Sequence, residues 1–329
     1  MGATPWLSVL VPVHNVAPYL RDLVVSVMGQ ADEGVELLLL DDASTDGSAA
    51  LMQALQQAHG PRVRLLRHET NQGVAAARNH LLDAALGRHV WFVDADDWLL
   101  PGALPALRAL LQQDDSPDVV LCDFAIVRAR STLKHRLRGE GHRPGFIGPA
   151  RQTVRSPAAL LQGVLASGNV FVWTVIARRS LWGDDLRFPT GRCFEDMATV
   201  PRLLLRAASG WHAAQPWVAY RRREGSILDH MSAAKVADLS RALVGVRAQA
   251  RHAGLPPDAI FALDHQCARN YIAARRHALR LTRSEQEGLL PALRADFDAA
   301  TEHTGPVLLQ TLQRRGWWLR WWRLRAALA

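Results

Sequence analysis

"HVWFVDADDWLLPGAL" (residues 89–104) closes an apolar run with three carboxylates, Asp94, Asp96 and Asp97. No Lys or Arg occurs from residue 89 to residue 107 to neutralise them. Carboxylates this close repel one another, so the stretch predicts a cation or a polar ligand nearby. In an extended strand alternate side chains share a face, which would set Asp94 and Asp96 about 6.6 Å apart along the chain. One could bind a sugar hydroxyl while the other holds Mg²⁺ or Mn²⁺, which prefer oxygen ligands.

The same three carboxylates have a purely structural interpretation. Negative charge is favourable at a helix N-terminus, and a helix is expected to begin near Pro101. The position of the cluster in the chain favours the ligand instead, because it follows the fourth strand of an alternating strand–helix pattern, and in parallel sheets ligands collect at the carboxyl ends of the strands.

That pattern predicts an α/β fold with a mostly parallel sheet flanked by helices, followed by a C-terminal helical region. Strands are expected at 6–13, 35–40, 62–68 and 89–94, with helices near 17–30, 48–58 and 74–86. Polar residues stand at the ends of these strands: His14 and Asn15, Asp41 and Asp42, then the acidic cluster.

The second half of the sequence is less regular. We expect a helix at 102–113, strands at 117–127 and 169–179, a basic loop or hairpin at 128–155, and a helix at 194–208. From about residue 232 the pattern is helical, with breaks at 254–257 and 305–306. The predicted division is a catalytic domain at 1–230, with halves 1–115 and 116–230, and a helical region at 231–329.

The bulk composition limits the classes of protein. Of 329 residues, 49% are apolar and 21% charged, which permits an ordinary buried core. No apolar run reaches the roughly 18 residues of a membrane span, and no signal peptide is evident, so a cytoplasmic location is expected. The three cysteines lack disulfide or zinc spacing. The net charge of +8, carried mainly by arginine, suits a nucleotide, a nucleic acid or an acidic lipid.

Two further strand ends carry candidate ligands. Asp41 could accept a hydrogen bond from a base or a ribose, whereas Asp46 and Ser48 are typical of turn and N-cap positions. Arg78, inside the helix after "NQGVAAARN" (71–79), could reach a pyrophosphate or simply pair with an aspartate. Neither G-x-G-x-x-G after the first strand nor G-x-x-x-x-G-K-[ST] is present, so a bound diphosphate would need another counter-charge, such as a metal on Asp96.

Several motifs, in order, resemble the nucleotide-binding half of family 2 glycosyltransferases with the GT-A fold. They are "SVLVPVHN" (8–15), "LLLLDDASTDGS" (37–48), "NQGVAAARN" and "VWFVDADDWLLPGAL". "RCFEDMATVPRLL" (192–204) resembles that family's acceptor-side Glu-Asp motif, and "YRRREGSI" (220–227) its Tyr-x-x-Arg…Ser-Ile segment. The resemblance covers about residues 6–230, with one departure at His14, where relatives often carry Tyr.

The resemblance implies a metal-dependent, inverting transfer from a nucleotide-sugar, most often a uridine diphosphate sugar, to a hydroxyl of a glycan or lipid-linked acceptor. Asp196 would be the general base. Adjacent helix residues project about 100° apart and cannot both face the sugar, so Glu195 would contact the acceptor or orient a neighbouring residue. Mn²⁺ or Mg²⁺ would lie on Asp96, with Asp94 and Asp97 as further contacts, and the alternative for Asp97 is an N-cap of the following helix. The expected nucleotide-sugar site is Pro12, His14, Asn15, Asp41, Asp42, Arg78, Asp94 and Ala95. Bacterial surface-polysaccharide or lipopolysaccharide synthesis is the implied setting.

The C-terminal tail "QRRGWWLRWWRLRAALA" (313–329) combines tryptophan with arginine and contains no acid. On a helix Trp317, Trp318, Trp321 and Trp322 would form one stripe, which is typical of a helix lying on an anionic membrane surface. The alternative is that this stripe packs on the catalytic domain or on a second subunit.

Other classes of protein remain to be weighed. The arginine excess suggests a nucleic-acid-binding protein, but no helix-turn-helix, RNA-recognition or zinc signature accompanies it, so no nucleic-acid partner is expected. A nucleotidyltransferase would also use aspartate-bound metal, and a catalytically dead scaffold is the third alternative.

Overall fold

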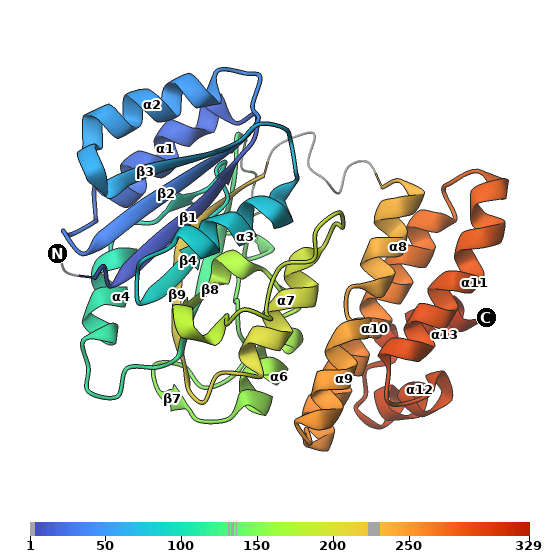
Figure 1. The fold of residues 1–329 in the computed structure, drawn as a ribbon. Coiled ribbons are helices and arrows are strands. Elements are labelled where there is room, and N and C mark those ends of the chain that lie inside the picture. The colour runs from blue at the N-terminus through green and yellow to red at the C-terminus, as the bar shows by residue number, and fades with distance from the viewer. Residues whose placement is uncertain (1–3, 131, 133–134, 136, 223–230) are drawn as a thin grey trace.

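The computed structural model describes residues 4–130, 132, 135, 137–222 and 231–329. In these residues nine strands form one sheet in the order β3-β2-β1-β4-β8-β6-β9-β5, with β7 paired to β9. Helices cover the sheet, and the last helices form a group beside its second half (Figure 1). The predicted mostly parallel α/β sheet with a C-terminal helical region is confirmed.

The first half of the sheet is parallel, as predicted. Strand β1 (Leu7–Val13) lies between β2 (Val35–Asp42) and β4 (His89–Phe92), and β3 (Val63–His68) pairs with β2. Every residue of β2 is buried, because helices cover both faces of the sheet. The crossovers are α1 (Ala17–Met28), α2 (Ser48–His59) with the short η1 (Gly60–Arg62), and α3 (Val74–Ala84).

The second half is mixed. After α4 (Ala103–Leu111), β6 (Val119–Arg128) runs antiparallel to β8 (Val175–Arg178), which in turn is antiparallel to β4. Helix α7 (Glu195–Leu204) and strand β9 (Gly210–Arg222) follow, with η3 (Arg179–Leu181) after β8. The sequence pattern did not predict four elements: β5 (Trp98–Leu99), β7 (Thr153–Val154), α6 (Pro157–Ser167) and β9.

The predicted strand at 169–179 is wrong for its first half. Residues Val172–Thr174 form the 3₁₀ turn η2, and only Val175–Arg178 is strand. The cause is local: both the backbone N–H and the Oγ1 hydroxyl of Thr174 donate to the carbonyl of Phe171, which closes a turn. In the basic stretch at 128–155, Arg143 pairs back antiparallel onto Phe124, in agreement with a hairpin or loop, while residues 131, 133, 134 and 136 lie outside the described residues.

The helical region runs from α8 to α13. Its elements are α8 (Ala233–Arg241), α9 (Val244–His252), α10 (Pro257–Ala278), α11 (Arg283–Ala300), α12 (Gly305–Arg314) and α13 (Trp318–Leu328). The break predicted at 254–257 is found, whereas Gly305 begins α12, and the chain turns just before it. One buried cluster joins residues of β1, α6, α7, α10 and α13, so these helices share a core with the sheet. No helix among the described residues is long and apolar enough to cross a membrane.

Candidate active site

The crevice at the carboxyl ends of β1 and β4 is where an open α/β sheet is expected to bind a ligand. The chain order reverses there, because β2 and β3 lie on one side of β1 and β4 on the other. Pairing between β1 and β4 ends at Leu10 and Phe92, so the two strands separate before Pro12 and the acidic cluster. Pro12, which has no N–H to donate to a neighbouring strand, is half-buried at this separation.

The acidic cluster forms a turn, not the extended strand expected from the sequence. Strand β4 ends at Phe92, and the N–H of Asp97 donates to the carbonyl of Asp94 at 3.0 Å. Asp94 and Asp96 are therefore not alternate residues of one strand face. Both are partly exposed, whereas Ala95 and Asp97 between and after them are buried.

Asp97, the last residue of this turn, has a buried side chain that anchors the turn to β9. Its Oδ1 accepts the backbone N–H of Arg221 at 2.7 Å, and its Oδ2 is buried without a hydrogen-bond partner. Burial, with the nearby charges of Asp94 and Asp96, raises the pKa of Asp97 well above its usual range. The alternative role as an N-cap is wrong, because Gly102 caps the following helix and no side chain bonds there.

Arg221 holds the turn from the neighbouring strand β9. Its Nε donates to the carbonyl of Asp96 at 2.8 Å, and its guanidinium lies 4.6 Å from the Trp98 ring centre and 4.9 Å from that of Tyr19. Sequence reasoning noticed "YRRREGSI" only as a family motif and gave Arg221 no role. Tyr220, Arg221 and Arg222 belong to β9, and the rest of that motif lies outside the described residues.

Arg78 joins both halves of the site. This buried guanidinium donates to Asp94 Oδ1 at 2.9 Å, to Glu195 Oε1 at 2.6 Å and to Asp196 Oδ1 at 2.6 Å. Burial opposes its charge, but the three carboxylates outweigh burial and raise the pKa of Arg78. Of the two roles considered for Arg78, the structure shows pairing with aspartate, and it adds two partners that lie more than a hundred residues away.

Glu195 and Asp196 converge, contrary to the expectation that adjacent helix residues diverge. Both carboxylates accept from Nη1 of Arg78, because they occupy the first turn of α7, just after Phe194 turns the chain with φ 62°. The second oxygen of Asp196 accepts the N–H of Val172 at 3.0 Å. Burial raises the pKa of Asp196 to about 7, although Arg78 acts in the opposite direction. Such a carboxyl group can exchange a proton near neutral pH.

Asp41 and Asp42, the last two residues of β2, differ in how many of their carboxylate oxygens already accept hydrogen bonds. Asp41 Oδ1 accepts the N–H of Ser44, and its buried Oδ2 has no hydrogen-bond partner. Asp42 is fully used by the chain itself: it accepts from His68 and from the backbone N–H groups of Gln72 and Gly73. Asp41 is thus able to accept a further donor, whereas Asp42 orders the loop before α3.

His14 and Asn15, both exposed, form the outer wall of this edge. His14 Nδ1 lies 2.9 Å from the carbonyl oxygen of Asp42, and its Nε2 lies 3.0 Å from Asn71 Nδ2. Asn15, with φ 53°, accepts the N–H of Thr45 at 2.8 Å. These contacts tie the loops after β1 and β2 together and leave the His14 ring facing solvent.

An aromatic stack that the sequence analysis did not predict lies between the two acidic groups. The rings of Phe171 and Trp173 stack at 4.7 Å, and Trp173 stacks on Tyr220 at 5.7 Å. Phe171 precedes Val172, the donor to Asp196, while burial and the charges of Asp97 and Asp96 raise the pKa of Tyr220. No sequence pattern predicts this stack, because Phe171 and Trp173 lie at η2 and Tyr220 lies in β9, far away along the chain.

The acidic turn has few side chains that could hold a divalent cation. Among the described residues, no group of three or more His, Cys, Asp or Glu side chains is placed to hold a metal. The partly exposed Asp94 and Asp96 instead offer an oxygen-only donor set on one turn. This set fits a hard cation that takes one or two protein carboxylates and completes its shell with phosphate oxygens and water.

The sheet and its crevice have the arrangement of the GT-A fold, and comparison with known proteins shows what the chain is similar to. The sequence model "Glycosyl transferase family 2" matches residues 8–163. The chain is a glycosyltransferase with the GT-A fold, and its residues 8–163 are similar to glycosyl transferase family 2. This similarity favours a glycosyltransferase over the nucleotidyltransferase alternative.

Curated relatives agree. Glycosyltransferase GlyG of Streptococcus pneumoniae serotype 4 is 27% identical over 222 residues, which cover 68% of this chain and 72% of GlyG. The putative teichuronic acid biosynthesis glycosyltransferase TuaG of Bacillus subtilis is 39% identical over 93 residues, 28% of this chain and 36% of TuaG. The chain thus spans most of one relative and about a third of the other.

Solved structures share the fold. Residues 1–349 of Staphylococcus aureus TarS, in complex with UDP-GlcNAc, superpose with a TM-score of 0.75 at 21% identity, covering 98% of this chain and 87% of that one. The mannosyltransferase PcManGT of Pyrobaculum calidifontis, in complex with GDP-Man and Mn²⁺, gives a TM-score of 0.53 at 20% identity, covering 99% and 86%.

Proposed function

We propose that this glycosyltransferase moves a sugar from a uridine diphosphate sugar to a hydroxyl of a glycan or lipid-linked acceptor, with inversion, in bacterial surface-polysaccharide or lipopolysaccharide synthesis. The observation that carries the proposal is the Arg78 network, in which one guanidinium bonds Asp94 on the donor side and Glu195 and Asp196 on the acceptor side. Displacement at a sugar carbon needs both groups within reach of one atom.

The donor half of the proposal rests on the crevice between β1 and β4. Asp41, whose buried Oδ2 has no hydrogen bond and lies 3.7 Å from Nε of Arg67, would accept from the base or ribose, and Asp94 would accept a ribose hydroxyl. Pro12, His14, Asn15, Asp42, Arg78 and Ala95 would shape the same site. The complexes of TarS with UDP-GlcNAc and of PcManGT with GDP-Man support a nucleotide-sugar as the donor class.

A divalent cation, Mn²⁺ or Mg²⁺, would be held by Asp96, with Asp94 as a second ligand. When bound, it supplies positive charge to the leaving diphosphate. We assign the third candidate, Asp97, to supporting the turn, because its accepted bond from Arg221 and its burial suit that role.

The acceptor half rests on Asp196 and Glu195. The acceptor oxygen forms a bond to the anomeric carbon, the bond from that carbon to the phosphate oxygen breaks, and the nucleoside diphosphate leaves. The hydroxyl proton passes to the Asp196 carboxylate, whose raised pKa suits a general base near neutral pH. Glu195 would orient the acceptor, and the partly exposed rings of Phe171 and Tyr220 at the two ends of the stack would contact a sugar ring.

Asp96→Ala tests the donor site. We expect the variant to bind uridine diphosphate in the presence of Mn²⁺ about tenfold or more weakly, because it lacks the carboxylate that would hold the cation. Isothermal titration calorimetry measures the affinity. Asp83→Ala, which removes an exposed carboxylate paired with Arg187, is the matched control. Undiminished affinity in Asp96→Ala would refute the metal assignment.

We also propose that the enzyme is cytoplasmic and attaches peripherally to an anionic membrane through residues 313–329, so that residues 1–230 carry the chemistry and 231–329 carry the attachment. In α13 the two sides of the tail differ: Trp317 packs against Phe261 and His265, and Leu324 is buried. Trp318, Leu319 and Trp322 are exposed, by 61%, 62% and 62%. The packing alternative thus accounts for one face only.

Trp318→Gln combined with Trp322→Gln tests the attachment without disturbing the packed face. We expect this variant to pellet several-fold less with phosphatidylglycerol vesicles, because tryptophan inserts at the headgroup level. Val25→Gln with Leu86→Gln is the control, since both are exposed apolar side chains of the N-terminal half. Equal pelleting of the tryptophan variant and the unmodified chain would contradict membrane attachment.

A further inference from the structure

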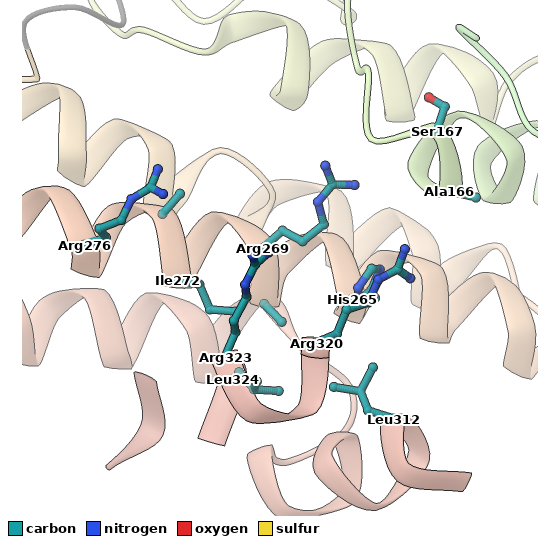
Figure 2. A pocket seen from close by; sticks show the side chains of 12 residues that line it. Ala166, Ser167, His265, Arg269, Ile272, Arg276, Leu312, Arg320, Arg323 and Leu324 are labelled. Carbon is teal, nitrogen blue, oxygen red and sulfur yellow. The ribbon is translucent and has the colours of Figure 1, made fainter. Parts of the chain in front are cut away.

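A cavity of about 430 Å³ lies between α6, α10 and α13, away from the strands that build the candidate active site. Four arginines line this cavity, Arg269 and Arg276 from α10 and Arg320 and Arg323 from α13. His265 and Ser167 line it as well. Figure 2 shows Arg269, Arg276 and Arg320 extending from these helices toward the side on which α6 carries Ala166 and Ser167. We call this cavity the arginine pocket.

Among the described residues, the arginines of the pocket differ from their neighbours in having no carboxylate partner. Arg247 and Arg251 pair with Glu302, and Arg315 pairs with Asp258. No ion pair joins any of the four pocket arginines to a carboxylate within the part of the chain that the structure describes. The guanidinium carbon of Arg320 lies 4.0 Å from the centre of the Trp317 ring, and this contact does not neutralise the positive charge of Arg320.

The pocket is consequently a region of concentrated positive charge. Burial and the charges of Arg320, Arg269 and Arg315 lower the pKa of His265 to about 4, so this imidazole is neutral at pH 7 and adds no further charge. Surrounding protein and the charge of Arg320 likewise lower the pKa of Arg269. Positive groups held together without counter-charge are stabilised by any anion that enters.

The geometry of the side chains indicates which anion. Guanidinium groups present paired N–H donors that match the oxygens of phosphate, and Arg binds such groups in a bidentate manner. Arg269 is held in place by close packing, because a Cβ on Gly168 at the end of α6 would overlap its guanidinium. A second hollow of about 380 Å³ shares Arg276 and Arg323 with the pocket and adds Arg280, Leu279 and Trp322.

We propose that the arginine pocket is a second anion site of this enzyme, one that binds the phosphate of a phosphate-bearing molecule. The acidic turn and the arginine pocket are opposite in charge, and they are built by different elements, so the second site does not depend on the proposed donor site. A phospholipid headgroup and a soluble organic phosphate share this chemistry. The apolar wall of the second hollow could accept the glycerol and acyl carbons of a lipid.

The test uses the full chain with Arg276→Gln and Arg323→Gln, which empties the centre of the pocket and leaves Arg269 packed. Binding of inorganic pyrophosphate is measured by calorimetry with a chelator and about 150 mM salt, conditions that suppress loose surface attraction. We expect the unmodified chain to bind and the double variant to lose about tenfold or more in affinity. The melting temperature verifies that the variant is folded.

Arg283→Gln with Arg294→Gln is the matched control, because it removes two positive charges from exposed arginines of α11 that already have carboxylate partners. It should bind pyrophosphate within about twofold of the unmodified chain. Because Arg323 also lies in the tail proposed to attach to a membrane, a short-chain phosphatidylglycerol below its micelle-forming concentration, compared with the matching phosphatidylcholine, identifies the source. Loss of short-chain phosphatidylglycerol and pyrophosphate binding together indicates a lipid headgroup, and loss of pyrophosphate binding alone indicates a soluble phosphate. Three results overturn the proposal: no binding by the unmodified chain, equal binding by the pocket variant, or an equal loss in the control.

Discussion

Asp196→Asn is expected to reduce sugar transfer by roughly 10²–10⁴-fold, the contribution typical of a general base, while donor binding stays within about twofold. The amide retains one oxygen, which can accept from either Arg78 or Val172, and the bond to the other donor is lost on the acceptor side of the network. The amide cannot take up the hydroxyl proton. Release of nucleoside diphosphate in the presence of acceptor measures transfer, and calorimetry measures donor affinity.

The unmodified enzyme should show a matching dependence on pH. A general base works when deprotonated, and the pKa of Asp196 is raised to about 7, chiefly by burial. Transfer should therefore fall as the pH decreases below about 7 and level off above it. Asp185→Asn, at an exposed carboxylate paired with Arg206, should leave the rate and its pH profile unchanged. An Asp196→Asn enzyme with normal turnover would remove Asp196 from the role of base.

Arg78→Met is expected to lower the free energy of unfolding by about 3–5 kcal/mol at pH 7, because removing one partner of a buried ion pair leaves uncompensated charge. Here one guanidinium serves Asp94, Glu195 and Asp196 together, and methionine replaces its volume without its charge. Chemical denaturation measures the loss. Arg187→Met, at an arginine whose ion-pair partner is the single exposed Asp83, should cost about 1 kcal/mol or less.

The defect of Arg78→Met should also shrink in acid. Burial raises the pKa of Asp196 to about 7 against the opposing charge of Arg78, so without the guanidinium this pKa rises further. The added penalty is present above about pH 7 and is relieved as Asp196 is protonated at lower pH. Glu195→Gln added to Arg78→Met should recover part of the stability at pH 7 for the same reason. A variant that denatures like the unmodified chain at pH 7 would show that the network contributes little to stability.

The parallel half of the sheet and its helices could be predicted because their signal is local. Strands β1 and β2 are near-continuously apolar, and α1 and α3 repeat apolar residues at helical spacing, since each element must bury its own face. The residues after these strands were expected to meet at one edge for the same reason. The hydrogen-bond partners of these residues were not predictable. The N–H of Ser44 decides which oxygen of Asp41 has no hydrogen bond, and Asp42 accepts from the backbone N–H groups of Gln72 and Gly73.

The second half shows where local patterns stop being sufficient. Strand β9 was missed because its inward and outward residues do not alternate cleanly, and it gains its place by pairing along β6, with a register shift near Asp123. The turn at Asp94 was mistaken for strand because the apolar run before it is strand-like. Arg221, which holds that turn, lies more than a hundred residues later in the chain.

By itself the sequence determined the alternation of strands and helices, the carboxyl-end position of the polar residues, and the family through its ordered motifs, because each of these follows from neighbours in the chain. Only the tertiary structure decided that Asp94, Glu195 and Asp196 share one buried guanidinium, that Asp97 is the buried carboxylate of the acidic turn, and that four arginines of α10 and α13 line one cavity without an ion pair to any described carboxylate. Charges interact through space, and their energy depends on burial and distance, which no spacing along the chain can encode.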